Sequence, residues 1–224
     1  PACFPKQRAV VRDRAHAVRT NLKNPLASDC RMAKLRWQLL DKPSSLAKQL
    51  QYQPRARKLH MGCQQAVINI DGQQGGGLKT VLKNFSFANQ RFESEEGPNR
   101  DIACTLQASM LFLSSEVDDP NRTKAEKDCD AEILEVFNAE DMSLFGFESD
   151  LAAHGTEFLR LFDVSLPDPA LLARRLREFI KETKRLFMDG LILHESNKNT
   201  VTAIVFKTLA TSKGTFYWRK EART

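Results

Sequence analysis

Positive charge is concentrated at the start of this 224-residue chain. The first 70 residues contain 14 Lys or Arg and 3 Asp, which gives a net charge of +11. The rest of the chain contains 20 Lys or Arg and 25 Asp or Glu, which gives −5. A division of this kind predicts that the basic part meets a polyanion, such as nucleic acid, or an acidic protein surface. We therefore expect a basic arm over residues 1–60 and a body over residues 61–224.

Composition places the chain among ordinary globular proteins, with 42% hydrophobic and 28% charged residues. No apolar run approaches the roughly 18 residues that span a bilayer, and the first residues lack the apolar core of a secretory signal. The five cysteines are scattered and form no CxxC pair. This spacing argues against a zinc site and against a disulfide framework. We expect free thiols in an intracellular, reducing compartment, and neither a metal nor a cofactor.

Short amphipathic helices that end at prolines are expected in the arm. One apolar stripe runs from Val11 to Leu22 and a second from Met32 to Leu40, and a short helix restarts at Ser45. Residues 51–58 are typical of an extended basic linker. Such an arm could neutralise phosphates, while an organelle-targeting segment is the alternative. The cations predicted to contact nucleic acid or a partner are Arg8, Arg12, Arg14, Arg19, Arg31, Lys34, Arg55, Arg57 and Lys58.

A glycine-rich loop, residues 72–80, follows a predicted strand at residues 66–71. The loop has the composition of a phosphate-binding loop, but Leu78 separates Gly77 from Lys79, and that motif requires Gly-Lys-Ser/Thr without interruption. We interpret the loop mainly as a flexible connection between arm and body. A weaker hypothesis is an anion-binding loop, whose residues would be Gly75, Gly76, Gly77, Lys79 and Thr80.

Strand-like patterns recur in the body. Apolar and polar residues alternate between Ile102 and Phe112, which indicates a strand, although the same residues also fit one face of a helix. Residues 85–88, 191–194 and 201–206 are predicted strands as well, because they are rich in aromatic and β-branched side chains. Together these segments predict a mainly antiparallel sheet.

The clearest helix should begin at Pro169, after Asp168 as its cap, and should end near Met188, before Gly190. Its apolar side chains fall on one arc, which we expect to face the body. A basic ridge occupies the opposite arc and could track a phosphate backbone or meet an acidic partner; the alternative is an ordinary solvated face. The ridge consists of Arg174, Arg177, Lys181 and Lys184.

The sequence thus predicts an α+β fold, with two substantial helices on a mainly antiparallel sheet, preceded by a basic helical arm. The expected function is that of a non-catalytic subunit of a larger assembly, whose arm contacts nucleic acid or neighbouring subunits. One alternative is a protein-linking structural subunit without nucleic-acid contact. Another is an enzyme that acts on a nucleotide or phosphorylated ligand through residues 72–80. No catalytic residue is predicted.

Overall fold

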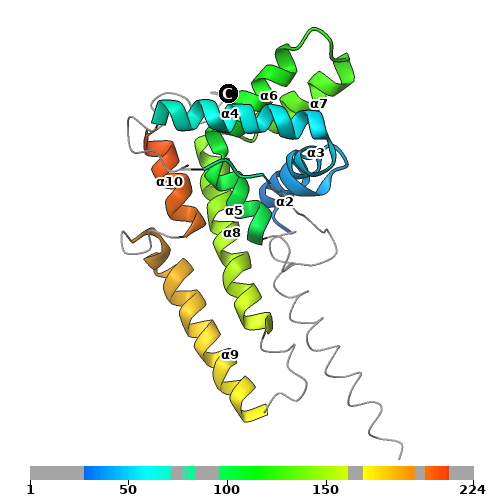
Figure 1. Ribbon diagram of the computed structural model, residues 1–224. Helices are drawn as coiled ribbons and strands as arrows, with labels where there is room; N and C mark the ends of the chain where they lie inside the picture. Colours follow the sequence, from blue (N-terminus) through cyan, green and yellow to red (C-terminus); the bar gives the residue numbers. More distant parts are fainter. Residues whose placement is uncertain are drawn as a thin grey trace, which may run out of the picture.

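The computed structural model of the chain describes residues 28–71, 78, 80–83, 96–160, 169–194 and 200–211. These residues form helices and connecting turns and contain no strand (Figure 1). The predicted α+β fold with an antiparallel sheet is therefore wrong, and the described part of the chain is all-α. The elements are α2 (Cys30–Arg36), the π-helical turn η1 (Trp37–Asp41), α3 (Leu46–Tyr52), α4 (Pro54–Asp71), α5 (Glu96–Cys104), α6 (Leu106–Asp118), α7 (Lys124–Leu134), α8 (Ala139–Leu159), α9 (Pro169–Thr183), the π-helical turn η4 (Lys184–Met188), the 3-10 turn η5 (Leu191–Leu193) and α10 (Val201–Thr211).

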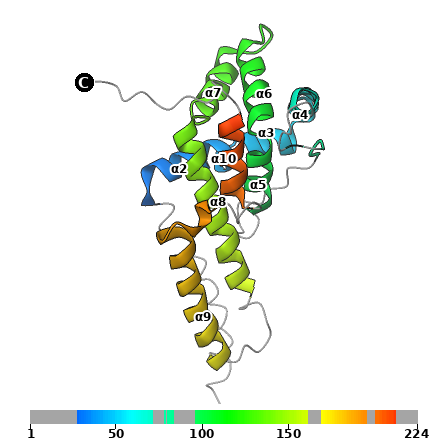
Figure 2. The same ribbon diagram turned by 90° about the vertical axis from the view of Figure 1, so that its left-hand side faces the viewer.

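The longest helix, α8, runs through the middle of the bundle. Helices α2, α5 and α10 pack against it, whereas α4 packs on α3 and α6 (Figures 1 and 2). Helices α6 and α7 form an antiparallel pair, with α6 packed on α4. Helix α9 lies beside the C-terminal half of α8, away from the α6–α7 pair (Figures 1 and 2). One hydrophobic cluster joins all these elements except α9, and Leu39, Phe112 and Phe145 are completely buried within it.

The basic region from residue 30 onward belongs to this core. The side chains of Leu35, Leu40 and Leu50 are buried in the same cluster as those of α6 and α8. The two helical segments predicted on either side of Pro43 are confirmed as α2–η1 and α3. The extended linker predicted at residues 51–58 is wrong, because α4 begins at Pro54. A proline suits the first turn of a helix, where its missing N–H would have no partner.

Side-chain caps define where several helices begin. Thr123 and Glu126 form a reciprocal capping box at α7, in which the Glu126 carboxylate accepts from the Thr123 N–H at 2.9 Å. The Asn138 side chain accepts from the Asp141 N–H at 2.9 Å at the start of α8. Such caps satisfy N–H groups that have no partner within the helix and stabilise it by about 1 kcal/mol each.

The segment predicted as a strand at residues 201–206 is part of helix α10, although it is rich in β-branched residues. The Asp150 carboxylate, on α8, accepts from the N–H groups of Val201 (2.8 Å) and Thr202 (2.7 Å). Val201 and Val205, one helical turn apart, are buried in the core. Helix-end capping from a neighbouring helix, together with this burial, therefore outweighs the local strand preference.

Three other strand predictions are wrong as well. Residues 102–112 occupy α5 and α6, where Ile102, Leu106 and Leu113 lie on buried turns, so the helical alternative for this segment is correct. Residues 66–71 are the last turns of α4. Residues 191–193 form a 3-10 turn, and residues 85–88 lie outside the described residues.

The helix predicted from Pro169 to Met188 is confirmed as α9 followed by η4. Gly190 ends it with a φ of 75°, in the left-handed region that glycine adopts most easily. Within the described part of the chain, no helix is both long enough and apolar enough to cross a membrane.

Two glycines within helices should respond in opposite ways to the same substitution. Gly62, in α4, has open space where the methyl group of an alanine would lie, whereas a Cβ at Gly146 would lie 3.0 Å from the Thr202 backbone Cα. We expect Gly62→Ala to stabilise the protein by roughly 0.5–1 kcal/mol, through the better helix propensity of alanine. Gly146→Ala should destabilise it, because α8 and α10 must separate. Urea unfolding followed by circular dichroism checks both, and equal effects at the two positions would contradict this packing.

Candidate binding surface on helix α9

Several described cations of the predicted arm lie against carboxylates of the body. Arg31, at the start of α2, donates to Asp141 and, at 2.8 Å, to Glu140 at the start of α8. Hydrogen bonds to Asp141 and Glu140 raise the pKa of the Arg31 guanidinium. Lys34 lies 3.8 Å from Glu135 in an exposed pair. The Arg31 contacts join α2 to the first turn of α8, whereas Glu135 lies at the end of α7.

A buried ion pair lies at the centre of this contact between α2 and α8. The Arg36 guanidinium donates to the Glu148 carboxylate at 2.9 Å, and the two side chains are only 4% and 1% exposed. Sequence reasoning did not single out Arg36, although it follows Leu35 in the apolar stripe. Lys42 is also almost buried, and it reaches the Glu132 carboxylate and the Cys129 carbonyl of α7, each at 3.4 Å.

A second network joins α4 to α6 and α7; its carboxylates Glu116 and Asp130 are buried, whereas the Arg55 side chain is 60% exposed. Arg55 lies 3.1 Å from Glu116 and 2.6 Å from Asp119, at the end of α6. Arg122 pairs with Glu116 and, at 3.0 Å, with Asp130. Gln49 of α3 donates to Asp130 at 2.7 Å. Burial raises the pKa of Asp130, so this carboxylate depends on its partners to remain charged.

The other predicted contact residues of the arm and the glycine-rich loop have different surroundings. Arg57 caps the preceding helix α3 by donating to the Leu50 carbonyl at 2.9 Å and to the Gln51 carbonyl. Lys58 and Thr80 are exposed. The remaining residues lie outside the described part of the chain: Arg8, Arg12, Arg14, Arg19, Gly75, Gly76, Gly77 and Lys79.

Removing one partner of the buried pair should be far more damaging than removing an exposed cation nearby. We expect Arg36→Met to lower the free energy of unfolding by about 3–5 kcal/mol, because the buried Glu148 carboxylate would lose the Arg36 guanidinium. Lys34→Met, on the same helix, should change it by less than about 1 kcal/mol.

Urea unfolding of both variants, with the double variant Arg36→Met/Glu148→Met, measures these effects. The double variant should recover most of the stability, because an apolar pair replaces the ion pair. An Arg36→Met protein as stable as the Lys34→Met protein would show that α2 is not held to α8 in this way.

The surroundings of the glycine-rich loop differ from those of a phosphate-binding loop. That motif needs a strand before the loop and a helix N-terminus after it, where N–H groups and the helix dipole attract the anion. Here the loop follows the C-terminal end of α4, and residues 80–83 after it are not helical. The end of a helix presents carbonyl groups and a partial negative charge, which disfavours a bound anion.

His60 and Ser109 lie close enough to suggest a catalytic pair, but their hydrogen bonds argue for a structural role. The Gln64 amide accepts from the Leu82 N–H at 2.7 Å, so its NH2 group faces His60 Nδ1 at 3.1 Å. His60 Nδ1 is then the acceptor, and Nε2 carries the proton toward Ser109 Oγ, 3.1 Å away. A general base would instead need an unprotonated Nε2 that accepts a hydrogen bond from the Ser109 hydroxyl. Both side chains are buried, and burial lowers the pKa of His60 to about 4.

Aromatic contacts hold α9 on α8. The Phe179 ring stacks on His154 and on Phe158, with ring centroids 4.6 Å and 4.4 Å apart. His154 Nε2 lies 2.9 Å from the Thr183 hydroxyl, one turn after Phe179. Helix α9 runs alongside the C-terminal half of α8 (Figure 2).

The rest of α9 faces outward. All four cations of the predicted basic ridge are exposed, and Arg174 lies 3.4 Å from Glu178. Sequence reasoning missed a second feature: Leu176 and Ile180, expected to face the body, are 45% and 58% exposed. The amphipathic pattern gave the correct helix, but its apolar arc is wider than the part that α8 covers among the described residues.

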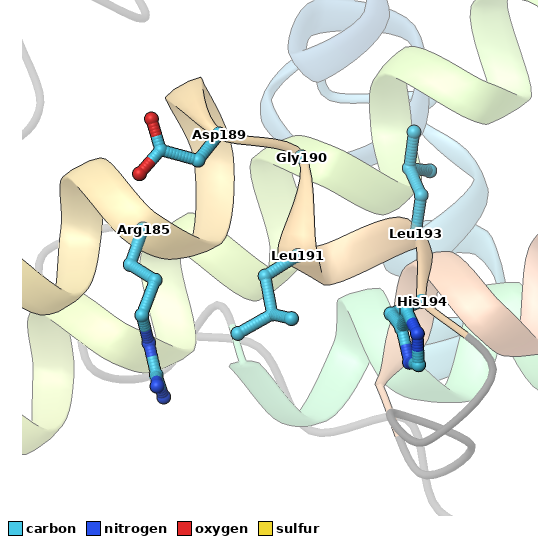
Figure 3. A pocket seen from close by; sticks show the side chains of 6 residues that line it. All are labelled: Arg185, Asp189, Gly190, Leu191, Leu193 and His194. Carbon is cyan, nitrogen blue, oxygen red and sulfur yellow. The ribbon is translucent and has the colours of Figure 1, made fainter.

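A shallow pocket of about 430 Å³ lies where α9 ends. It is lined by Arg185, Asp189, Gly190, Leu191, Leu193 and His194. Figure 3 shows the Arg185 and His194 side chains reaching in the same direction on either side of Leu191. Arg185 already pairs with Glu182 at 2.8 Å, and Asp189 adds a negative charge, so the pocket lacks the unbalanced positive charge of an anion site.

No family model, curated protein or solved structure matches the chain, so its function has to be argued from its own residues.

Proposed function

We propose that this chain is a non-catalytic, α-helical subunit that links proteins within an assembly, and that α9 is its docking element. The outer face of α9 is the observation that carries the proposal. There Leu176 and Ile180 remain about half exposed and lie next to the exposed Arg177 and Lys181. Apolar side chains at the centre and charged ones at the rim are typical of a protein interface.

Two features favour a protein partner over nucleic acid. A helix that only follows a phosphate backbone needs cations and gains little from exposed leucine and isoleucine. In addition, Arg31, Arg36 and Arg55 are already engaged by carboxylates of the body, which leaves less of the basic region for a polyanion. The arm cations from Arg8 to Arg19 remain a predicted contact for nucleic acid or neighbouring subunits.

A binding role, rather than catalysis, is favoured by the groups that could react. Among the described residues, no group of three His, Cys, Asp or Glu side chains could hold a metal ion. Burial raises the pKa of the Cys63 and Cys104 thiols, which keeps them in the unreactive protonated form. The four described cysteines are free thiols, and we assign the subunit to a reducing, intracellular compartment on that basis.

Site-specific photo-cross-linking tests the proposal. A photoreactive phenylalanine analogue replaces Ile180 in the full chain, which is expressed in cells of its source; the matched control replaces Leu111 of α6, which is 48% exposed. We expect discrete protein adducts from position 180 that survive nuclease digestion, and none of the same size from position 111. An absence of adducts at position 180, or the same adducts at both positions, would contradict a docking role for α9.

Nucleic-acid binding through α9 is the second candidate. It is favoured by the spacing of Arg174, Arg177, Lys181 and Lys184, which places all four on the exposed side of one helix. Adducts at position 180 that disappear on nuclease digestion would favour this candidate over the protein-linking role.

A further inference from the structure

We infer that the partner of α9 is an acidic amphipathic helix, which packs its apolar stripe on Leu176 and Ile180 and places its carboxylates against Arg177, Lys181 and Lys184. The inference rests on the proposed linking function and adds the chemistry of the partner. It follows from the order of side chains around α9, from the pairing of its charges, and from the part of its apolar face that α8 leaves open.

Three lines of side chains follow one another around α9. At about 100° per residue, Phe179 and Thr183 share the line that contacts α8. Leu176 and Ile180 form the next line, one turn apart and about half exposed. The third line is basic. An incoming helix laid on the middle line would therefore have α8 on one side and the cations on the other.

The third line consists of Arg177, Lys181 and Lys184, and its charge is not balanced by the acidic residues of α9. Glu178 pairs with Arg174 and with Arg175, and Glu182 pairs with Arg185. The three cations of the third line form no ion pair with any residue that the structure describes, and all three are exposed. Unbalanced positive charge beside an apolar line selects a partner with negative charge in the same place.

The geometry of the outer face of α9 favours a partner helix over a second copy of α9 or a membrane surface. A second copy of α9 would bring the same cations together and be repelled. A membrane-surface helix buries its whole apolar face, but Phe179 of α9 is already stacked on His154 and Phe158. A helix needs only the narrow line that remains, and it offers apolar residues at the matching one-turn spacing.

Purified full-length chain and synthetic peptides provide the test. The probe is a fluorescent helical peptide about three heptads long, with leucine at two positions of each heptad and glutamate beside them. Two control peptides carry lysine in place of glutamate, or the same residues in an order without the apolar stripe. Binding is measured by fluorescence anisotropy at low and at physiological salt.

We expect the acidic peptide to bind at least about ten-fold more tightly than either control, and less tightly as salt increases. Ile180→Ser should weaken binding about ten-fold, whereas Leu111→Ser should not. The triple variant Arg177→Glu/Lys181→Glu/Lys184→Glu should bind the lysine peptide instead. The control triple variant Lys58→Glu/Arg100→Glu/Lys124→Glu makes the same change in net charge at exposed positions elsewhere, and it should keep the original preference.

Equal binding of the acidic and lysine peptides, or equal effects of the two triple variants, would overturn the inference. Self-association of the chain that is lost with Ile180→Ser would assign this face to a second copy instead. Tighter binding to anionic lipid vesicles than to the acidic peptide would assign it to a membrane surface. If the peptides bind without selectivity but position 180 still gives protein adducts, the linking function stands and only the partner chemistry is wrong.

Discussion

The described fold depends on packing between the basic start of the chain and the acidic body, in which ion pairs accompany a shared hydrophobic core. The most buried of them joins Arg36 to Glu148 and fixes α2 against the central helix α8. Arg31, Lys42 and Arg55 form further, more exposed pairs with carboxylates of α8, α7 and α6. Because Leu35, Leu39 and Leu50 are buried in the same core, hydrophobic packing and charge pairing act on the same segment. The acidic surface that the uneven charge predicts is therefore supplied, for these residues, by the chain itself.

This arrangement changes where a partner is to be sought. A cation held by a buried carboxylate contributes to folding and offers little to an external polyanion. Helix α9 differs, because Phe179 and Thr183 contact α8 while Leu176, Ile180 and the basic side chains face outward. This combination supports the proposed interface, and α9 is the element on which the proposed function depends.

Helix ends and amphipathic helices could be read from the sequence, whereas the partners of each face could not. Pro169, Gly190 and the stripe from Met32 to Leu40 gave correct helices, because capping and helical periodicity are local properties. Residues 201–206 were predicted as a strand from their β-branched side chains. The interactions that make them helical, the cap from Asp150 and the close approach at Gly146, come from a distant helix and are not visible in the local sequence. The apolar pattern between residues 102 and 112 fitted both a strand and a helix. The segment is helical in the structure, where its apolar side chains are buried in the bundle.

In the candidate site, too, local features could be predicted from the sequence and long-range contacts could not. The basic ridge of α9 was predicted, since four cations at helical spacing are visible in the sequence. The exposure of Leu176 and Ile180 was not, because it depends on how much of the apolar arc α8 covers. The engagement of Arg31 and Arg55 was equally invisible, since their carboxylate partners are 61 or more residues away in the chain.

Native-state hydrogen exchange tests the central claim, that the basic region from α2 to α3 is part of one folded body. Exchange of the full chain, resolved by mass spectrometry, compares amides of α2, η1 and α3 with those of α8. We predict that the most protected amides of both regions exchange only through global unfolding, with equal opening free energies. Much faster exchange across residues 30–52, with α8 still protected, would show an arm that folds separately from the body and would contradict the account.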